Sequence, residues 1–251
     1  MNAEGAARLL VAARQSGRTI ADLDGEFRPA TEADAYAVQE ATLRLLGARE
    51  AGWKVGAANA AAPPVAAPLV STLVQKSPAH FAAREDAFRA VEAELCLVLG
   101  RDLPQRASPY GEDEAWAAVA SVHAAIELLD TRFADRTAMA PPVLLADMQN
   151  NGGFCYGPPN PVAGVDFLAA RASLLIDGKE VKSAVGGNPA GHPKRLLAWL
   201  ADHAASRGRP LRAGMVVTTG SHTGITVAPL GSRVTARFAG LGESVLDLAP
   251  A

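Results

Sequence analysis

The chain has 251 residues, of which 49% are hydrophobic and 20% charged, so one large domain with a substantial core is expected. The net charge of −2 and the scattered Lys and Arg residues argue against nucleic-acid binding, which usually requires clustered basic side chains. No signal-peptide pattern is present and no stretch approaches the roughly 20 apolar residues of a membrane span. We therefore expect a cytoplasmic protein without a membrane partner. Cys96 and Cys155 stand far apart and fit small core side chains in a reducing compartment.

The first 50 residues are predicted to form a helical N-terminal segment. An amphipathic pattern predicts a helix over 3–15, and Thr31 with Asp34 resembles a capping box that opens a second helix over about 32–46. A domain spanning 51–251 would follow this segment.

That domain begins with GWKVG at 52–56, which has the pattern of a short strand edged by glycines. Residues 57–75 are rich in Ala and Pro and nearly free of charge. An interdomain linker usually carries more charge or more Ser and Gly, so we favour a loop folded over a pocket.

From Val91 onward β patterns dominate. The strand-like runs are VEAELCLVL, AIELLD, the stretch around GFCYG, SLLIDG with VKSAV, MVVTTGS and VTARFAG. One helix interrupts them, with Pro193 in its first turn and Gly208 after its end. Because helices and strands do not alternate regularly, a Rossmann or TIM-barrel plan is disfavoured, and an α+β protein around a curved mixed sheet is favoured.

The strongest chemical pattern is the pair Glu92 and Glu94 in VEAELCLVL. In a strand these side chains share one face, and the apolar residues between and beside them lie on the other. Adjacent carboxylates repel and burial raises the cost of both charges, penalties that a bound cation removes. A half-exposed strand whose polar face meets water has the same spacing. Glu127 favours the metal site, because a Glu inside the apolar run AAIELL is out of place unless paired. Three carboxylates favour Mg²⁺ or Mn²⁺ over zinc and leave positions for water and substrate.

Lys54 is the second candidate, placed between Trp53 and Val55 with a glycine on each side. Two roles are open: a functional lysine that meets a carboxylate, or an edge-strand lysine that reaches water. Asp130 and Arg132 are expected to form local ion pairs or to hold the Glu127 strand in place.

A third candidate is the run TTGSHTG at 218–224, whose Thr219 and Ser221 offer hydroxyls and backbone N–H groups to an anionic substrate, although a plain turn has the same composition. The histidines lack HxxxH or HxH spacing. No GxSxG, P-loop or GxGxxG motif is present, so a hydrolase triad and a nucleotide site are without support.

An ordered set of motifs carries a family resemblance. After LLVAARQSGRTI and TEADAYAVQ come GWKVG, VEAELCLVL, AIELLDTRFAD, GHPKRLLAWLADH, LRAGMVVTTGSHTG and FAGLGESVLDL. Over nearly its whole length the chain resembles the 2-keto-4-pentenoate hydratase and 4-oxalocrotonate decarboxylase group of the fumarylacetoacetate hydrolase superfamily. The resemblance implies a mixed β-sandwich roll, with residues 51–251 as the metal-binding catalytic domain.

The resemblance also implies a site. A magnesium or manganese ion held by Glu92, Glu94 and Glu127 would chelate a small 2-oxo acid through its carboxylate and keto oxygens. Lys54 would lie near the reacting carbons. Asp147, in LADMQNN, falls where relatives carry an acidic residue, and the resemblance implies a catalytic role for it beside Lys54. Met148 replaces the Asn that follows this acid in relatives.

The activity implied first is hydration of 2-hydroxypenta-2,4-dienoate in aromatic catabolism, by a homo-oligomer of two or more copies. Decarboxylation of an oxalocrotonate-like acid, C–C hydrolysis and a non-catalytic partner subunit are the alternatives. Two departures bear on this choice. Ala57-Ala58-Asn59-Ala60 replaces a Thr-Ser or Ser-Lys, and Ser71 with Thr72 stand where many relatives have an acidic pair. These departures allow a substrate that differs from that of the well-known pathway enzymes.

Overall fold

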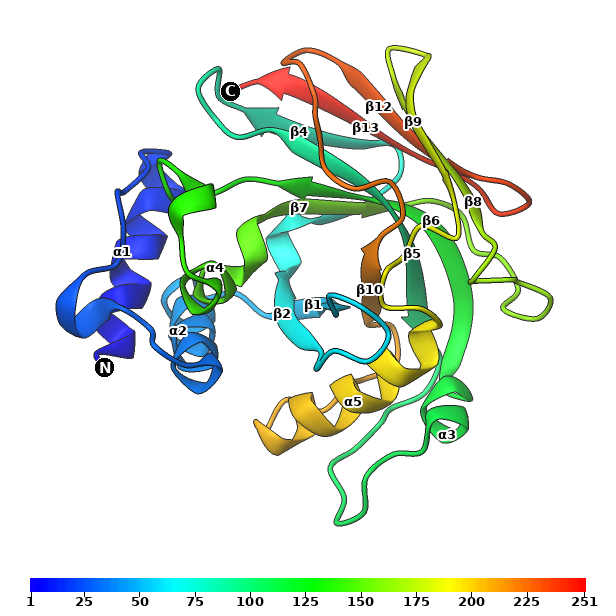
Figure 1. Ribbon diagram of the computed structural model, residues 1–251, viewed down its shortest axis with the longest axis horizontal. Coiled ribbons are helices and arrows are strands. Elements are labelled where there is room, and N and C mark those ends of the chain that lie inside the picture. The colour runs from blue at the N-terminus through cyan, green and yellow to red at the C-terminus, as the bar shows by residue number, and fades with distance from the viewer.

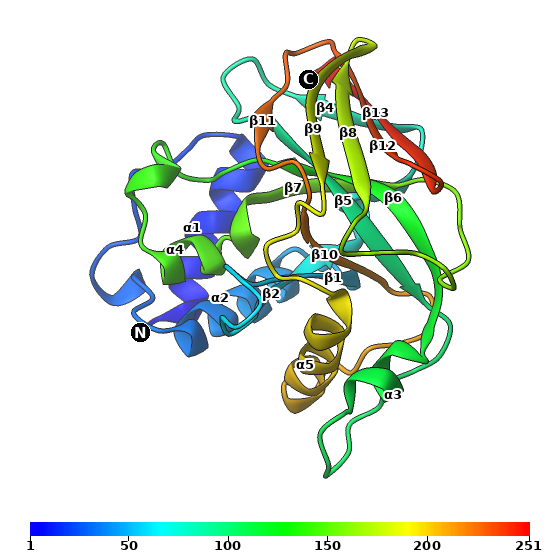
Figure 2. The ribbon, with the colours of Figure 1, turned by 45° about the vertical axis from the view of Figure 1, so that its right-hand side comes forward.

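Two mixed β-sheets dominate the computed structural model, which describes residues 1–251 (Figures 1 and 2). The larger sheet has the order β2-β1-β10-β5-β6-β7-β3, and β11 pairs with β5. Its strands are β1 (Glu50–Gly56), β2 (Val65–Val70), β3 (Val74–Lys76), β5 (Ala90–Leu99), β6 (Val119–Leu129), β7 (Asn151–Tyr156), β10 (Val216–Ser221) and β11 (Thr226–Val227). The predicted α+β class with a mixed sheet is confirmed.

The smaller sheet has the order β4-β13-β12-β8-β9. Its strands are β4 (Ala79–Ala83), β8 (Arg171–Ile176), β9 (Lys179–Val185), β12 (Arg233–Phe238) and β13 (Gly242–Pro250). Three pairings join distant parts of the chain in parallel: β1 with β10, β3 with β7 and β4 with β13.

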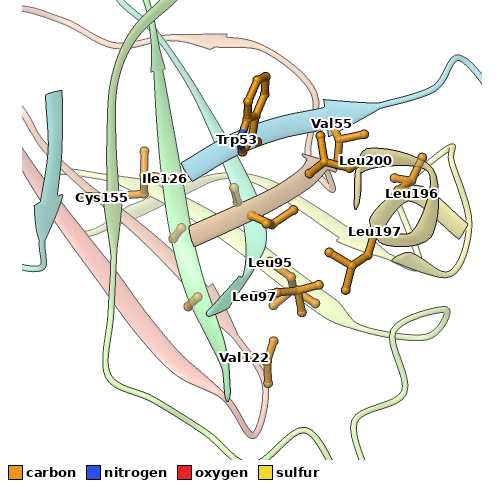
Figure 3. Close-up of a cluster of buried hydrophobic side chains, with 14 of the residues drawn as sticks. Trp53, Val55, Leu95, Leu97, Val122, Ile126, Cys155, Leu196, Leu197 and Leu200 are labelled. Carbon is orange, nitrogen blue, oxygen red and sulfur yellow. The ribbon is translucent and has the colours of Figure 1, made fainter. Parts of the chain in front are cut away.

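The main core lies on one face of the larger sheet, against the smaller sheet and the helix α5 (Pro193–Ser206). Every second residue of β5 enters it, and Figure 3 shows Leu95 and Leu97 of that strand close to Leu197 of α5. The opposite face of β5 carries Glu92, Glu94 and Cys96, as the alternation of a strand requires. The candidate ligands and the packed core therefore lie on opposite faces of the same strand.

The helices α1 (Ala3–Ser16), α2 (Glu32–Leu45) and α4 (Pro141–Ala146) pack together beside the larger sheet (Figure 1). The capping box is present, because Thr31 accepts from the Asp34 N–H while Asp34 accepts from the Thr31 N–H. Phe133 and Val143 join the apolar cluster of these helices. The N-terminal segment is therefore packed against residues of the larger predicted domain, and a boundary at residue 50 stays a prediction.

The loop predicted over 57–75 is wrong beyond residue 64, because β2 and β3 occupy most of its second half. Ala66 and Ala67 are fully buried in β2, and Pro68 is tolerated because β2 lies at the edge of the sheet. Alanine and proline have low strand propensity, so this strand gave no β pattern. The short helices α3 (Glu112–Trp116) and α4 were also missed.

Both cysteines are buried in the core regions, and burial raises the pKa of Cys155 to about 12 and raises that of Cys96 as well. Both are unreactive core thiols, as expected. No helix of the structure is long and apolar enough to cross a membrane.

Candidate metal centre

The three predicted glutamates converge on one face of the larger sheet. Glu92 of β5 lies directly opposite Glu127 of β6, and Glu94 belongs to the same face one pair further along. One carboxylate oxygen from each lies within 4.8 Å of the others. Glu94 and Glu127 are 2% and 1% exposed, whereas Glu92 is half-buried. The cluster is thus closed on its sheet side and reachable from the side of Glu92.

Burial makes this cluster electrostatically unfavourable without a counter-charge. Desolvation, together with repulsion from Glu127, raises the pKa of Glu92. The pKa of Glu94 is raised well above its usual value, first by desolvation and then by Glu127 and Glu92. Lys54 lowers the pKa of both groups and offsets part of this cost.

Lys54 is brought to the carboxylates by the parallel pairing of β1 with β10, in which it lies opposite Thr218. Its Nζ lies 2.5 Å from Glu127 Oε1 and donates to the Gln149 carbonyl at 3.2 Å. The edge-strand alternative is wrong, because β1 lies between β2 and β10. Gly52 permits the pairing, since a Cβ there would lie 1.9 Å from the Val216 carbonyl oxygen.

Two neighbours of the carboxylates were not predicted. The Thr218 hydroxyl donates to Glu94, and the Asn151 side-chain amide donates to Glu127 Oε1 at 3.0 Å. Thr218 belongs to the TTGSHTG run named above as a candidate, but the sequence did not show that strand pairing places it beside Glu94. Asn151 begins β7, and nothing in its local sequence indicates that it faces Glu127.

A left-handed turn joins α4 to β7 and sets the Lys54 contact. Met148, Gln149 and Asn150 have φ values of 50°, 52° and 61°. This conformation costs roughly 1–2 kcal/mol for each residue other than glycine. It presents the Gln149 carbonyl to Lys54. Three consecutive left-handed residues without glycine have no sequence signature.

Of the two predicted substrate hydroxyls, only Ser221 lies at the cluster, where a hydrogen bond from it favours the charged form of Glu92. Thr219 is 1% exposed, and its hydroxyl donates to the Leu95 carbonyl at 3.5 Å. Gly220 separates them with a φ of 101°, at the point where the β10–β5 register shifts. This irregularity turns the end of β10 so that Ser221 pairs with Glu94.

Asp147 forms an ion pair with Arg132 and is not one of the three clustered carboxylates. Its Oδ1 accepts from Arg132 Nε at 2.6 Å, and both side chains are 2% exposed. Arg132 also lies 3.6 Å from Asp130, so the expected local ion pairs are present. Because its other oxygen accepts from the Arg132 N–H, both oxygens of this carboxylate bind Arg132, and a catalytic role for Asp147 stays a prediction.

The chemistry of the donor set fits a small divalent cation. Three carboxylates offer hard oxygen ligands, no sulfur or imidazole is among them, and the single lysine leaves the group with net negative charge. Glu92 on the open side leaves room for further ligands. These residues can hold Mg²⁺ or Mn²⁺.

Comparisons with known proteins identify the family of the chain. The model of the family "Fumarylacetoacetate (FAA) hydrolase C-terminal" matches residues 46–247. The chain is 32% identical to 2-keto-4-pentenoate hydratase 1 of Dechloromonas aromatica, over 97% of this chain and 95% of that protein. A 4-oxalocrotonate decarboxylase from Pseudomonas sp is 31% identical over 61% of this chain and 58% of its own length.

Among solved structures, 4-oxalocrotonate decarboxylase from Pseudomonas putida G7, complexed with calcium and acetate, has the same fold with a TM-score of 0.84. The match covers 98% of this chain and 97% of that one at 23% identity. The same enzyme complexed with magnesium and adipate matches equally well. The chain thus belongs to the fumarylacetoacetate hydrolase C-terminal family, close in sequence to its 2-keto-4-pentenoate hydratases.

Proposed function

We propose that this protein is a divalent-metal-dependent hydro-lyase that hydrates 2-hydroxypenta-2,4-dienoate or a close relative. The observation that carries the proposal is the meeting of Glu92, Glu94 and Glu127 with Lys54 on one sheet face. The similarity to 2-keto-4-pentenoate hydratases over almost the entire chain supports the choice of substrate class. A cytoplasmic homo-oligomer active in aromatic catabolism belongs to the same proposal.

Mg²⁺ or Mn²⁺ is the proposed cofactor. When bound to the three carboxylates, such an ion would stabilise negative charge on the keto oxygen of a 2-oxo acid and make its enol form accessible. This electron sink serves hydration, decarboxylation and C–C cleavage alike. The residues around it therefore decide which bond changes.

Lys54 is proposed to hold and deliver the proton. Its ammonium is fixed by Glu127 and by the Gln149 carbonyl, so it can be aimed at one carbon of the substrate. Proton transfer by a positioned group of this kind typically contributes roughly 10²–10⁴-fold to the rate. Ser221, beside Glu92, is the candidate to orient the substrate carboxylate.

A cavity of about 330 Å³ next to the Lys54 contact is proposed to receive the hydrocarbon end of the substrate. Glu32, Gln149 and Asn150 line it, and so do apolar side chains of β2 and α4. Val65 and Leu145 are among these apolar residues. An apolar wall suits a short diene chain better than a second carboxylate, which favours the hydratase over the decarboxylase of a dicarboxylic acid.

The alternative activity is decarboxylation of an oxalocrotonate-like acid, favoured by the relatives of that name. Ser71 and Thr72 are exposed. Because no acid stands at these two positions, they supply no second proton carrier for either reaction. The choice between the two substrates consequently rests on the largely apolar wall of the 330 Å³ cavity, which favours a hydrocarbon chain over a second carboxylate.

A spectrophotometric assay with Mg²⁺ or Mn²⁺ tests the proposal. 2-Hydroxypenta-2,4-dienoate and 4-oxalocrotonate are supplied in parallel to the wild type and to Glu127→Gln. We expect the dienoate absorbance to fall with the wild type, and the rate of this fall to be at least 10²-fold lower with the variant. Faster turnover of 4-oxalocrotonate would replace the hydratase by the decarboxylase. Inactivity on both compounds with metal bound would favour the non-catalytic partner subunit.

A further inference from the structure

A second cavity, of about 250 Å³, is lined by the end of α1, the loop after β4 and the end of β6. Its walls do not include any of the three glutamates or Lys54. Arginines from three separate segments line it: Arg14, Arg18, Arg84, Arg89 and Arg132. Only two acidic side chains, Asp86 and Asp130, share the lining. The cavity is therefore positively charged.

The acids of the cavity are already used by two of the arginines. Asp86 pairs with Arg84 at 2.5 Å, and Asp130 lies 3.6 Å from Arg132. Arg14, Arg18 and Arg89 take part in no ion pair of the chain. None of these three guanidinium groups has a carboxylate within ion-pair distance, although Asp130 and Asp147 offset part of the charge of Arg14.

Arg14 is the most constrained of the three. Its Nη2 donates to the Asn151 carbonyl at 3.1 Å, and Arg132 Nη1 donates to the same oxygen at 3.3 Å. Burial and repulsion from Arg132 lower the pKa of Arg14 to about 10. Two like charges held on one carbonyl are costly in a buried place, and an anion in the cavity would offset that cost.

Arg89 is fixed but incompletely bonded. Its Nη1 donates to the carbonyls of Arg84 and Ala87 at 2.6 Å and 3.0 Å, which ties down the loop after β4. Its Nε is buried and has no hydrogen-bond partner. Arg18 is exposed, and its guanidinium makes no hydrogen bond. Arg18 thus offers a guanidinium without hydrogen bonds, and Arg89 offers a fixed one whose Nη2 makes none.

We propose that this arginine cavity is a binding site for a small dianion, of the tetrahedral oxyanion or dicarboxylate class, held by Arg14, Arg18 and Arg89. Guanidinium groups suit both classes because their paired N–H groups match two oxygens of a carboxylate or phosphate. The size of the cavity limits the ligand to a small molecule. Binding of a dianion in this cavity does not require that the protein have the proposed lyase activity.

The location of the cavity joins it to the metal centre through one residue. The Asn151 carbonyl accepts from Arg14 and Arg132, and the Asn151 side chain donates to Glu127. An anion that draws Arg14 toward the cavity therefore acts on the residue that orients a proposed metal ligand.

Titration calorimetry tests the site on the full chain saturated with Mg²⁺. Sulfate and succinate are the probes for the two classes, with Arg18→Gln as the test variant because Arg18 is exposed and makes no structural contact. Arg8→Gln, on the exposed side of α1, removes the same charge outside the cavity. We expect saturable binding with wild type and Arg8→Gln, and binding weakened roughly tenfold or more in Arg18→Gln.

Glu92→Gln separates this site from the metal centre, where succinate can also bind. If binding is retained in Glu92→Gln and weakened in Arg18→Gln, the measured heat comes from the arginine cavity. The probe that binds more tightly then identifies the class of ligand. The proposal is overturned if neither probe saturates, or if Arg18→Gln binds as tightly as Arg8→Gln.

Discussion

Glu127 and Lys54 stabilise each other at a place where each charge alone would be unfavourable. Glu127 is 1% exposed and accepts from Lys54 and from Asn151. The sequence could predict that a glutamate inside an apolar strand needs a partner, and it could predict the three carboxylates. It could not predict Asn151 or the left-handed turn, because their role depends on the register of β7 and on backbone angles that no residue type there prescribes.

Replacing Lys54 by Met is expected to lower kcat by roughly 10²–10⁴-fold, because the variant removes the proposed proton carrier. With saturating Mg²⁺, the melting temperature should change little, since the three carboxylates and the cation remain. Steady-state kinetics beside a thermal melt measure both effects, with Lys182→Met on the exposed strand β9 as the control. Near-normal kcat in Lys54→Met would remove this lysine from the chemistry.

Asp147→Asn is expected to act on stability. The change leaves Arg132, 2% exposed, without its carboxylate partner, and breaking a buried pair typically costs about 3–5 kcal/mol. Denaturant unfolding should show this loss, while kcat of the folded variant stays near wild type. A variant that is stable but inactive would instead make Asp147 a catalytic acid, the role that the family resemblance implies.

At the scale of elements, helices with a clear cap and period were predictable and strands of small residues were not. Pro193 and Gly208 bound α5 as expected. The alternation of β5 fixed which of its faces is buried. The strand β2 escaped prediction, because VAAPLV has neither alternation nor β-branched residues through its middle, and it forms only by pairing with β1.

The packing of α5 on α2 predicts an acid-sensitive contact. The His203 ring stacks on Trp199 and lies 4.5 Å from Tyr36, and burial lowers its pKa to about 4. The unfolded chain binds this proton near pH 6.5, so His203 destabilises the fold progressively as pH falls from about 6.5 to about 4. His203→Phe should flatten this part of the stability–pH curve in urea unfolding. An unchanged slope would exclude His203 as its origin.

At the scale of the whole molecule, the metal centre and the fold are thermodynamically linked. The raised pKa values of Glu92 and Glu94 mean that the folded, metal-free protein holds protons that the unfolded chain has already lost. The contribution of these two groups to the free energy of unfolding is therefore greatest at low pH. It decreases as pH rises through their pKa values in the folded protein. A cation requires the charged carboxylates and reverses this trend.

We accordingly expect Mg²⁺ to raise the melting temperature more at about pH 8 than at about pH 5. Scanning fluorimetry with and without Mg²⁺ at the two values measures the difference. Glu94→Gln is the control, since it removes the most strongly shifted carboxylate. An equal increase at both pH values would contradict a site built on these protonated glutamates.

The parallel pairings of β1 with β10 and of β4 with β13 have a consequence for synthesis of the chain. β1 cannot acquire its inner neighbour until β10 has left the ribosome, and β4 waits for β13. A nascent chain can form the β5–β6 and β1–β2 pairs early, but β1 and β2 cannot join the larger sheet until β10 is available near the end of translation. Such long-range pairings fold slowly and leave strand edges open to other chains. Production of this protein should therefore depend on slow translation or on chaperones more than its modest size would imply.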